Sequence, residues 1–232
     1  MMKRSRLAGL ILGMGLMGCS PTKPEEPAPQ QEAWQDDIRS LKDATVTISP
    51  GHCAGVIVAD GRHALTAAHC IKGAPGARQS VVTRDGKVLG GEVKVVDSQR
   101  DLAVLRFDTL APVHPLAVAS WLPNPGEALL FAGRNDRAIA PQEVELRRLG
   151  RCPSLPDVPR ALFTSLRGEP GDSGAPVVDR HLRVVGLVHG GAACSIAAPT
   201  AEFSPLVDML VAEVARPDAQ QGVGGAGHSG PN

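Results

Sequence analysis

The sequence predicts an all-β protein made of two six-stranded antiparallel β-barrels, followed by a short C-terminal helix. Short β-prone runs alternate with turn residues along most of the chain and fall into two sets of six. The composition agrees, because 26 glycines and 20 prolines mark many turns. Aromatic residues make up only 3% and tyrosine is absent, so the core must consist mainly of Val, Leu, Ile and Ala.

The first set of runs lies in the N-terminal half of the chain. Asp60-Gly61 and Asp85-Gly86 are turn dipeptides that separate neighbouring runs as in β-hairpins. The expected strands are Thr45 to Ile48, Cys53 to Ala59, Ala64 to Ala67, Ser80 to Thr83, Lys87 to Val96 and Leu102 to Phe107.

The second set follows a proline-rich stretch, 111–126, which we expect to cross between the two barrels. Ser204-Pro205 then opens a helical run through Ala215, with serine as N-cap and proline at the first helical position. The expected strands are Ala128 to Ala132, Val144 to Leu149, Ala161 to Leu166, Ala175 to Val178, Arg183 to His189 and Thr200 to Phe203.

The N-terminus is typical of an export signal, since Lys3, Arg4 and Arg6 precede an apolar run over 7–17. That run is shorter than the about 20 residues that a membrane-spanning helix needs. The run ends in Leu-Met-Gly-Cys19, which resembles a bacterial lipobox and implies that residues 1–18 are removed and Cys19 is lipidated. The alternative is an ordinary signal peptide with an incidental cysteine.

The lipobox resemblance implies a lipid-anchored protein of the bacterial cell envelope. Ser20 follows the cysteine, and by resemblance to enteric sorting rules the absence of aspartate there favours the outer membrane, with the domain facing the periplasm or the surface. Residues 19–43 are rich in Pro, Glu and Gln over much of their length, so we expect a flexible tether. The folded domain is expected over 44–215, and the glycine-rich tail 216–232 is expected to be disordered.

Charge and histidine spacing exclude several classes of partner. Acidic and basic residues balance at 24 each, which argues against nucleic-acid binding, and we expect a monomer without a cofactor. We also expect no catalytic metal, because the histidines near turns lack metal-ligand spacing: His52, His63, His114 and His181. Apart from Cys19, the cysteines are even in number, which in an oxidising compartment favours two disulfides: Cys53, Cys70, Cys152 and Cys194.

Three motifs indicate a chemistry. They are Thr-Ala-Ala-His69-Cys, Asp101-Leu-Ala-Val-Leu and Gly171-Asp-Ser173-Gly-Ala-Pro. Each has a plain structural alternative: a core histidine, a turn aspartate or an ordinary loop. Together, in the order His, Asp, Ser, they resemble the trypsin-like (chymotrypsin-fold) serine peptidases over about residues 44–215.

The resemblance implies a serine endopeptidase that cleaves peptide or protein substrates through an acyl-enzyme. His69 would take the proton of the Ser173 hydroxyl, and Asp101 would orient His69. The backbone N–H groups of Gly171 and Ser173 would bind the oxyanion. The alternatives are a catalytically silent binding module of the same fold, or an esterase using the same triad.

The same resemblance implies a Cys53–Cys70 disulfide that holds the histidine in place, and it leaves Cys152 and Cys194 as a second pair. It places the primary substrate pocket at Arg167, Gly168, His189, Gly191 and Thr200.

Two of the pocket assignments are left open by the sequence. Arg167 could bind an acidic substrate side chain or be neutralised by Glu169 or Glu202. His189 departs from the serine common in relatives, so it could contact Asp101, line the pocket or be a plain strand residue.

The aspartate before the nucleophile, Asp172, also departs from the digestive enzymes. Those enzymes pair it with a newly cut N-terminus, and no matching cleavage motif is present here. If buried, Asp172 needs another partner, for which Arg134 and Arg137 are candidates, and the enzyme would then be competent without such cleavage.

Overall fold

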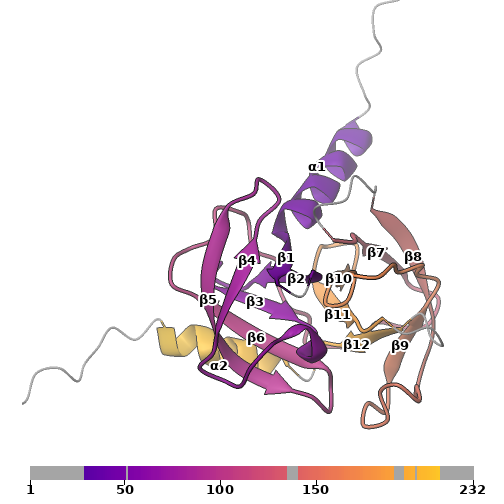
Figure 1. Cartoon of the computed structure of the whole chain (residues 1–232). Helices are drawn as coiled ribbons and strands as arrows, with labels where there is room; N and C mark the ends of the chain where they lie inside the picture. The colour runs from indigo at the N-terminus through magenta and orange to yellow at the C-terminus, as the bar shows by residue number, and fades with distance from the viewer. Residues whose placement is uncertain (1–28, 51, 135–140, 191–195, 202, 215–232) are drawn as a thin grey trace, which may run out of the picture.

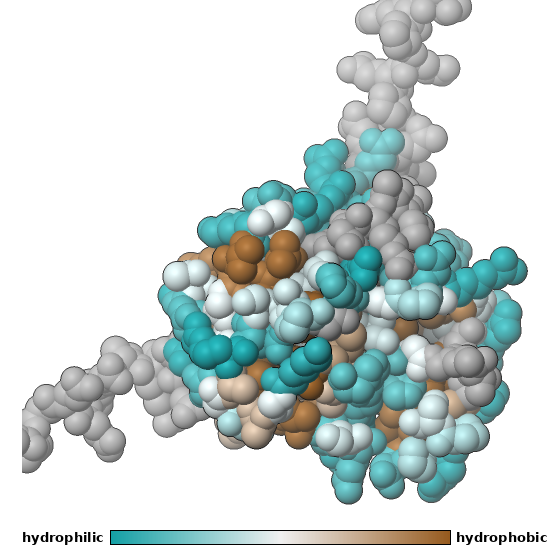
Figure 2. Space-filling view, viewed as in Figure 1, coloured by the Kyte–Doolittle hydropathy of each residue, from teal (hydrophilic) through white to brown (hydrophobic). Residues whose placement is uncertain are grey.

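Two closed β-barrels of six antiparallel strands each form the body of the protein, as the sequence predicts (Figure 1). The structure is a computed structural model, and it describes residues 29–50, 52–134, 141–190, 196–201 and 203–214. Most of the face seen in Figure 2 is hydrophilic, because the apolar side chains of the strands point into the barrels.

The first barrel is closed by pairing of β1 with β4, in the order β1-β2-β3-β6-β5-β4. The predicted turns at Gly61 and Gly86 are present, with φ of 76° and 84°, values that favour glycine. Its strands are β1 Thr45–Ser49, β2 Cys53–Val58, β3 His63–Thr66, β4 Arg78–Val82, β5 Val88–Asp97 and β6 Leu102–Phe107.

The second barrel is closed by pairing of β10 with β7, in the order β10-β11-β12-β9-β8-β7. Its strands are β7 Ala128–Phe131, β8 Gln142–Gly150, β9 Ala161–Thr164, β10 Pro176–Val178, β11 Val184–Val188 and β12 Ile196–Pro199. The segment 111–126 joins the barrels as expected. It makes one parallel bridge to each of them, Val58 with Leu116 and Val118 with Val184.

One predicted strand, Thr200 to Phe203, is wrong. The last strand ends at Pro199, and the Phe203 N–H donates to the Thr200 carbonyl in the turn that follows. Strand propensity alone does not decide which residues form the last strand. Residues Ile196–Pro199 pair with β9 and β11, whereas Phe203 lies after the strand and is buried in the core.

The flexible tether expected over 19–43 is also wrong for residues 29–43, which belong to helix α1, Pro29–Ala44. Composition misled the prediction, because the apolar positions Ile38, Leu41 and Ala44 follow a helical spacing. Leu41 and Ala44 are fully buried, so the end of the helix packs on the first barrel. Residues 19–28 lie outside the described part of the chain.

Helix α2, Ser204–Val214, begins where the sequence predicts and buries Val207 and Leu210. The predicted signal segment, Cys19 and the C-terminal tail lie outside the described residues. No helix in the described ranges combines the length and the apolar character needed to span a membrane.

Each barrel encloses its own cluster of buried side chains, and a third cluster joins the two barrels. The joining cluster includes Leu41 from α1, Val56 and Val104 from the first barrel, Leu187 from the second and Val207 from α2. Loops at the junction are therefore held by both barrels, and this is where the sequence motifs meet.

Candidate active site

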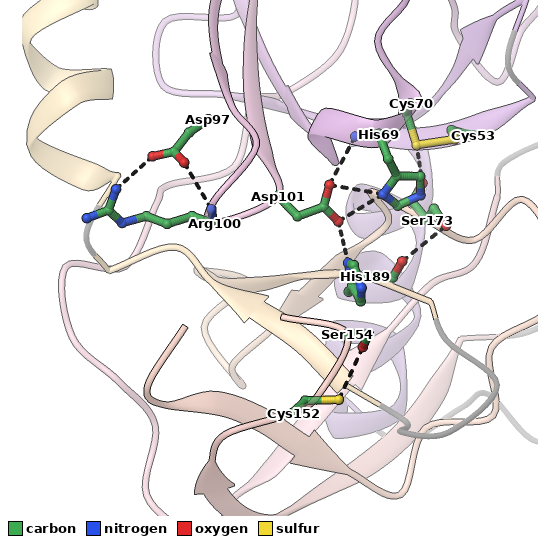
Figure 3. A network of polar contacts seen from close by, with 10 residues as sticks. All are labelled: Cys53, His69, Cys70, Asp97, Arg100, Asp101, Cys152, Ser154, Ser173 and His189. Carbon is green, nitrogen blue, oxygen red and sulfur yellow. Dashed lines mark hydrogen bonds and ion pairs between the residues drawn. A yellow bond between two sulfur atoms is a disulfide. The ribbon is translucent and has the colours of Figure 1, made fainter. Parts of the chain in front are cut away.

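The three motifs come together at the junction of the barrels (Figure 3). His69 lies on the short helical turn Ala68–Cys70 after β3, and Asp101 directly precedes β6, so both belong to the first barrel. Ser173 lies in the turn before β10 of the second barrel. The Ala54 N–H of β2 donates to the Ser173 carbonyl at 2.8 Å, which joins the two barrels at the site.

A disulfide fixes the turn that carries His69. Cys70 is bonded to Cys53 with a Cα–Cα distance of 5.9 Å, so the predicted Cys53–Cys70 pairing is confirmed. Cys194 lies outside the described residues, and its pairing with Cys152 stays a prediction. The Cys152 side chain is buried, with its Sγ 3.2 Å from Ser154 Oγ.

Asp101 holds both the ring and the backbone of His69. The His69 Nδ1 atom lies 3.0 Å from Oδ1 and 2.9 Å from Oδ2, and the His69 main-chain N–H donates to Oδ1 at 3.0 Å. An ionised carboxylate only accepts hydrogen bonds, so Nδ1 carries the hydrogen and Nε2 has a free lone pair. The His69 side chain is 45% exposed, whereas that of Asp101 is 6% exposed.

His189, at the end of β11, is the second imidazole on this carboxylate. Its Nδ1 hydrogen-bonds Asp101 Oδ2, and its ring stands edge-on to the His69 ring with 5.7 Å between the centroids. The His189 side chain is 14% exposed. The sequence left three alternatives for His189, and the structure shows the contact with Asp101.

These contacts move the pKa values of the His69–Asp101 pair apart. Burial alone raises the pKa of Asp101, but the hydrogen bonds from His189 and His69 outweigh it and lower that pKa to about 2. The hydrogen bond to Asp101 raises the pKa of His69 against the opposing effect of burial. The pair thus favours an ionised carboxylate beside a histidine that accepts a proton readily.

Ser173 lies on a turn whose next residue, Gly174, can only be glycine. A Cβ on Gly174, whose φ is 82°, would lie 2.2 Å from the Ala54 carbonyl oxygen. The Ser173 hydroxyl donates to the His189 carbonyl at 3.4 Å. Within the ranges that the structure describes, the N–H groups of Gly171 and Ser173 donate to no protein acceptor.

The buried Asp172 carboxylate is held from within the domain. Oδ1 accepts the main-chain N–H of Arg134 at 3.1 Å, and Oδ2 accepts that of Glu169 at 2.7 Å. The Arg134 guanidinium donates to the His52 carbonyl at 2.9 Å. Arg134, one of the two predicted partners, therefore contacts Asp172 through its backbone, and Arg137 lies outside the described residues.

Gly133 is a site residue that the sequence did not single out, since one glycine after a strand gives no distinctive signal. A Cβ there would stand 2.8 Å from Asp172 Oδ1, so the carboxylate can approach this backbone only because residue 133 has no side chain.

The predicted pocket residues are only partly brought together. Arg167 and Gly168 are exposed on the loop after β9. Thr200 is fully buried, and its hydroxyl donates to the Val184 carbonyl at 2.7 Å, so it stabilises the strands instead of presenting a surface. Gly191 and Glu202 lie outside the described residues.

Two groups of side chains in the described residues place potential metal ligands within 4.8 Å of one another. The first group is Cys53, His69 and Cys70, and its two sulfur atoms form the disulfide, so they are not thiolate ligands. In the second, His69, Asp101 and His189, a metal would have to displace the hydrogens of both Nδ1 atoms. The arrangement is suited to moving and holding protons.

Two six-stranded barrels with a histidine, an aspartate and a serine at their junction define the chymotrypsin-like class of folds. The family model of the trypsin-like peptidase domain matches residues 53–187, and the chain belongs to this family.

Two Synechocystis sp. proteins, HhoB and HhoA, have names that assign them to the serine proteases. They are 30% and 29% identical to this chain over 145 and 147 residues, or 59% of the chain in each case. The aligned part spans only 34% and 36% of their lengths.

Solved structures share the fold at lower identity. An inactive form of the Rv3671c protease superposes with a TM-score of 0.60 at 20% identity, covering 82% of this chain and 98% of that one. The HtrA-type protease AlgW, as a variant with a tripeptide, gives a TM-score of 0.63 at 19% identity, covering 77% and 63% of the two chains.

The close approach at Gly133 predicts a steric effect on stability. We expect Gly133→Ala to lower the free energy of unfolding by about 1–3 kcal/mol, because Asp172 must leave its backbone donors. Urea denaturation measures the loss. Gly150→Ala is the matched control, since its Cβ would come too close only to the end of the flexible Arg148 side chain and would lie at an ordinary contact distance of 3.7 Å from the Phe163 ring. In an Asp172→Ala background the Gly133 penalty should largely vanish, and an unchanged penalty there would contradict the explanation.

The low pKa of Asp101 predicts a pH dependence of stability. Because its folded value of about 2 lies below the ordinary 3.8, the group stabilises the fold above pH 3.8 and loses this contribution as the pH falls from there towards 2. Denaturation of wild type and Asp101→Asn between about pH 6 and pH 2 should therefore show a shallower acid loss in the variant. Asp36→Asn, on the exposed side of α1, is the control. Equal slopes in all three proteins would refute the assignment.

Proposed function

We propose that this protein is a serine endopeptidase in which Ser173 is the nucleophile, His69 the general base and Asp101 the residue that orients it. The observation that carries the proposal is the His69–Asp101 pair at the barrel junction, with Nδ1 held by the carboxylate and Nε2 left as the base. The serine lies across the junction, tied to the first barrel through Ala54. The protease names of the relatives agree with this chemistry.

The reaction needs one movement of the serine side chain. In the structure its hydroxyl donates weakly to the His189 carbonyl, and for catalysis it turns to donate to His69 Nε2. Attack on the substrate carbonyl carbon then passes the hydroxyl proton to Nε2. The imidazolium gives this proton to the leaving amine as the C–N bond breaks, leaving an acyl-Ser173 ester that water hydrolyses.

The oxyanion of each tetrahedral intermediate would be bound by the N–H groups of Gly171 and Ser173. Both donors are available among the described residues, and the φ of 98° at Gly171 is a conformation that favours glycine. One such donor contributes about 2.7–4 kcal/mol to the transition state in measured cases.

We further propose that the site is competent without proteolytic activation. In the digestive relatives a new N-terminus neutralises the aspartate before the nucleophile. Here two backbone N–H groups within the domain already stabilise that carboxylate, with Gly133 allowing its close approach. The loop that carries Gly171 and Ser173 therefore needs no external ion pair.

The proposed location is the bacterial cell envelope, with the domain held to a membrane by lipid on Cys19. The support is the basic and apolar start of the chain and the lipobox-like sequence that ends it. The apolar end of α1 packs on the first barrel, so such a tether would join the domain at that helix.

Active-site labelling tests the function directly. We expect a fluorophosphonate probe to form an adduct on Ser173 of the full chain, located by peptide mass spectrometry, and Ser173→Ala to give none, because only an activated serine attacks phosphorus at a useful rate. Labelling should persist in EDTA, since the mechanism uses no metal.

The other functions predict different outcomes. Labelling with cleavage of esters but not of unstructured peptides would indicate an esterase. No adduct on folded, disulfide-bonded protein would contradict the proposal and favour a binding module of the same fold.

Lipidation is tested separately from catalysis. Cells given an alkyne-bearing fatty acid should incorporate it into the wild-type protein and not into Cys19→Ser, because the thiol is the acceptor. After membrane fractionation, the Cys19→Ser variant should be found outside the membrane fraction. Equal incorporation in both proteins, or none in either, would exclude the anchor and leave an ordinary signal peptide.

A further inference from the structure

Positive charge is concentrated at one end of the ribbon formed by β8 and β9. Between residues 146 and 166 the charged side chains are four arginines and Asp157, although acidic and basic residues balance over the whole chain. All five of these residues are exposed. The arginines, which we call the arginine cluster, are Arg147, Arg148, Arg151 and Arg160.

The strand register places two members of the arginine cluster side by side. Gly150 and Ala161 form the last pair of β8 with β9. Arg151 directly follows Gly150 and Arg160 directly precedes Ala161, so the two arginines are neighbours where the ribbon ends. Like charges in facing positions repel and lower stability. An anion bound between them would relieve this repulsion.

Neutral groups orient two of the guanidinium groups. Arg148 pairs with Phe163 in the register, and its guanidinium carbon lies 3.5 Å from the centre of that ring. Arg151 Nη1 donates to the Pro156 carbonyl at 3.4 Å. An aromatic face and a carbonyl fix the direction of a guanidinium group without neutralising its charge.

The charge of the arginine cluster is not compensated by nearby carboxylates. Other arginines of the chain form ion pairs, such as Arg183 with Asp179 and Arg180 with Glu143. No member of the cluster forms such a pair with a residue that the structure describes. All four are arginine, and a guanidinium group binds a carboxylate through two parallel hydrogen bonds. The cluster is therefore suited to an anionic partner that carries several carboxylates.

A pocket with an empty volume of about 400 Å³ opens beside the cluster and shares Arg160 with it. Val158 and Pro199 give the pocket apolar walls, and Arg100 lines it from the first barrel. Arg100 directly precedes Asp101, but its side chain turns away from that carboxylate (Figure 3). The pocket thus lies next to the candidate active site and outside it.

We propose that the arginine cluster and this pocket form an exosite, a surface outside the active site that binds an acidic segment of polypeptide substrates. An apolar side chain of the segment would enter the pocket. This inference rests on the proposed peptidase function and adds a substrate class to it. Two observations favour a peptide over a phosphate polymer or an anionic lipid surface. The pocket has apolar walls, and Asp157, which also lines it, repels closely spaced phosphates.

Binding is measured with the full chain as Ser173→Ala, so that no turnover is needed. The probe is a fluorescein-labelled peptide of one leucine followed by six glutamates, and the readout is fluorescence anisotropy. We expect binding that weakens as salt is raised, and none to the same peptide with lysine in place of glutamate. Adding Arg151→Gln with Arg160→Gln should weaken binding on the order of 10-fold, because two guanidinium–carboxylate pairs are lost. The matched control, Arg39→Gln with Arg180→Gln, removes two exposed arginines from other elements and should bind as before.

Stability separates a lost contact from a damaged fold. Replacing Arg151 and Arg160 by glutamine should not lower the free energy of unfolding, because the substitutions remove a repulsion. Urea denaturation measures this, and Arg160→Gln alone takes the place of the double variant if the latter does not fold.

Turnover tests the link to substrates. For an unstructured peptide that the wild-type protein cleaves, an added extension of leucine and six glutamates should lower KM on the order of 10-fold relative to a glutamine extension. The value of kcat should be the same for both, because the extension contributes equally to binding of substrate and transition state. The advantage should disappear in the double arginine variant.

Different results overturn different claims. Equal affinities of the double arginine variant and its control, or equal binding of the glutamate and lysine peptides, would refute the exosite. Binding to phosphatidylglycerol vesicles without binding to the peptide would also refute it and assign the cluster to a lipid surface. If the glutamate peptide binds while wild type neither cleaves peptides nor is labelled on Ser173, the peptidase proposal fails and the site for acidic peptides stands.

Discussion

The buried carboxylate of Asp101 is the interaction on which the site depends. It accepts hydrogen bonds from the backbone and ring of His69 in its own barrel and from His189 in the other. Burial opposes its charge, and the donors outweigh that cost, so the carboxylate stays ionised. Because the donors come from both barrels, the chemistry exists only where the barrels meet.

Steric constraints at the same junction position the serine. Gly174 brings the turn within reach of the Ala54 carbonyl, and Gly133 lets Asp172 approach the backbone before Arg134. The Cys53–Cys70 disulfide holds the turn next to β2, the strand that also donates to the Ser173 carbonyl. Ser173 and the turn that carries His69, the proposed nucleophile and base, are thus both fixed to β2 by independent contacts.

The relatives place this chain in a family without defining its whole biology. The match to the trypsin-like peptidase domain covers the segment from Cys53 to Leu187, which contains both the histidine and the serine motifs. The chain aligns with about a third of the lengths of HhoB and HhoA, and the alignments leave the remaining parts of those proteins unmatched.

The sequence by itself determined the two barrels, eleven of the twelve strands, the C-terminal helix and the order of the motifs, because strand alternation, turn dipeptides and the residues around His69, Asp101 and Ser173 are local signals. Only the tertiary structure decided the docking of α1, the end of the last strand at Pro199, the burial of Thr200, and the contacts of Gly133 with Asp172 and of His189 with Asp101. These features depend on segments far apart in the chain meeting in a shared core, and no local pattern records which side chains will meet there.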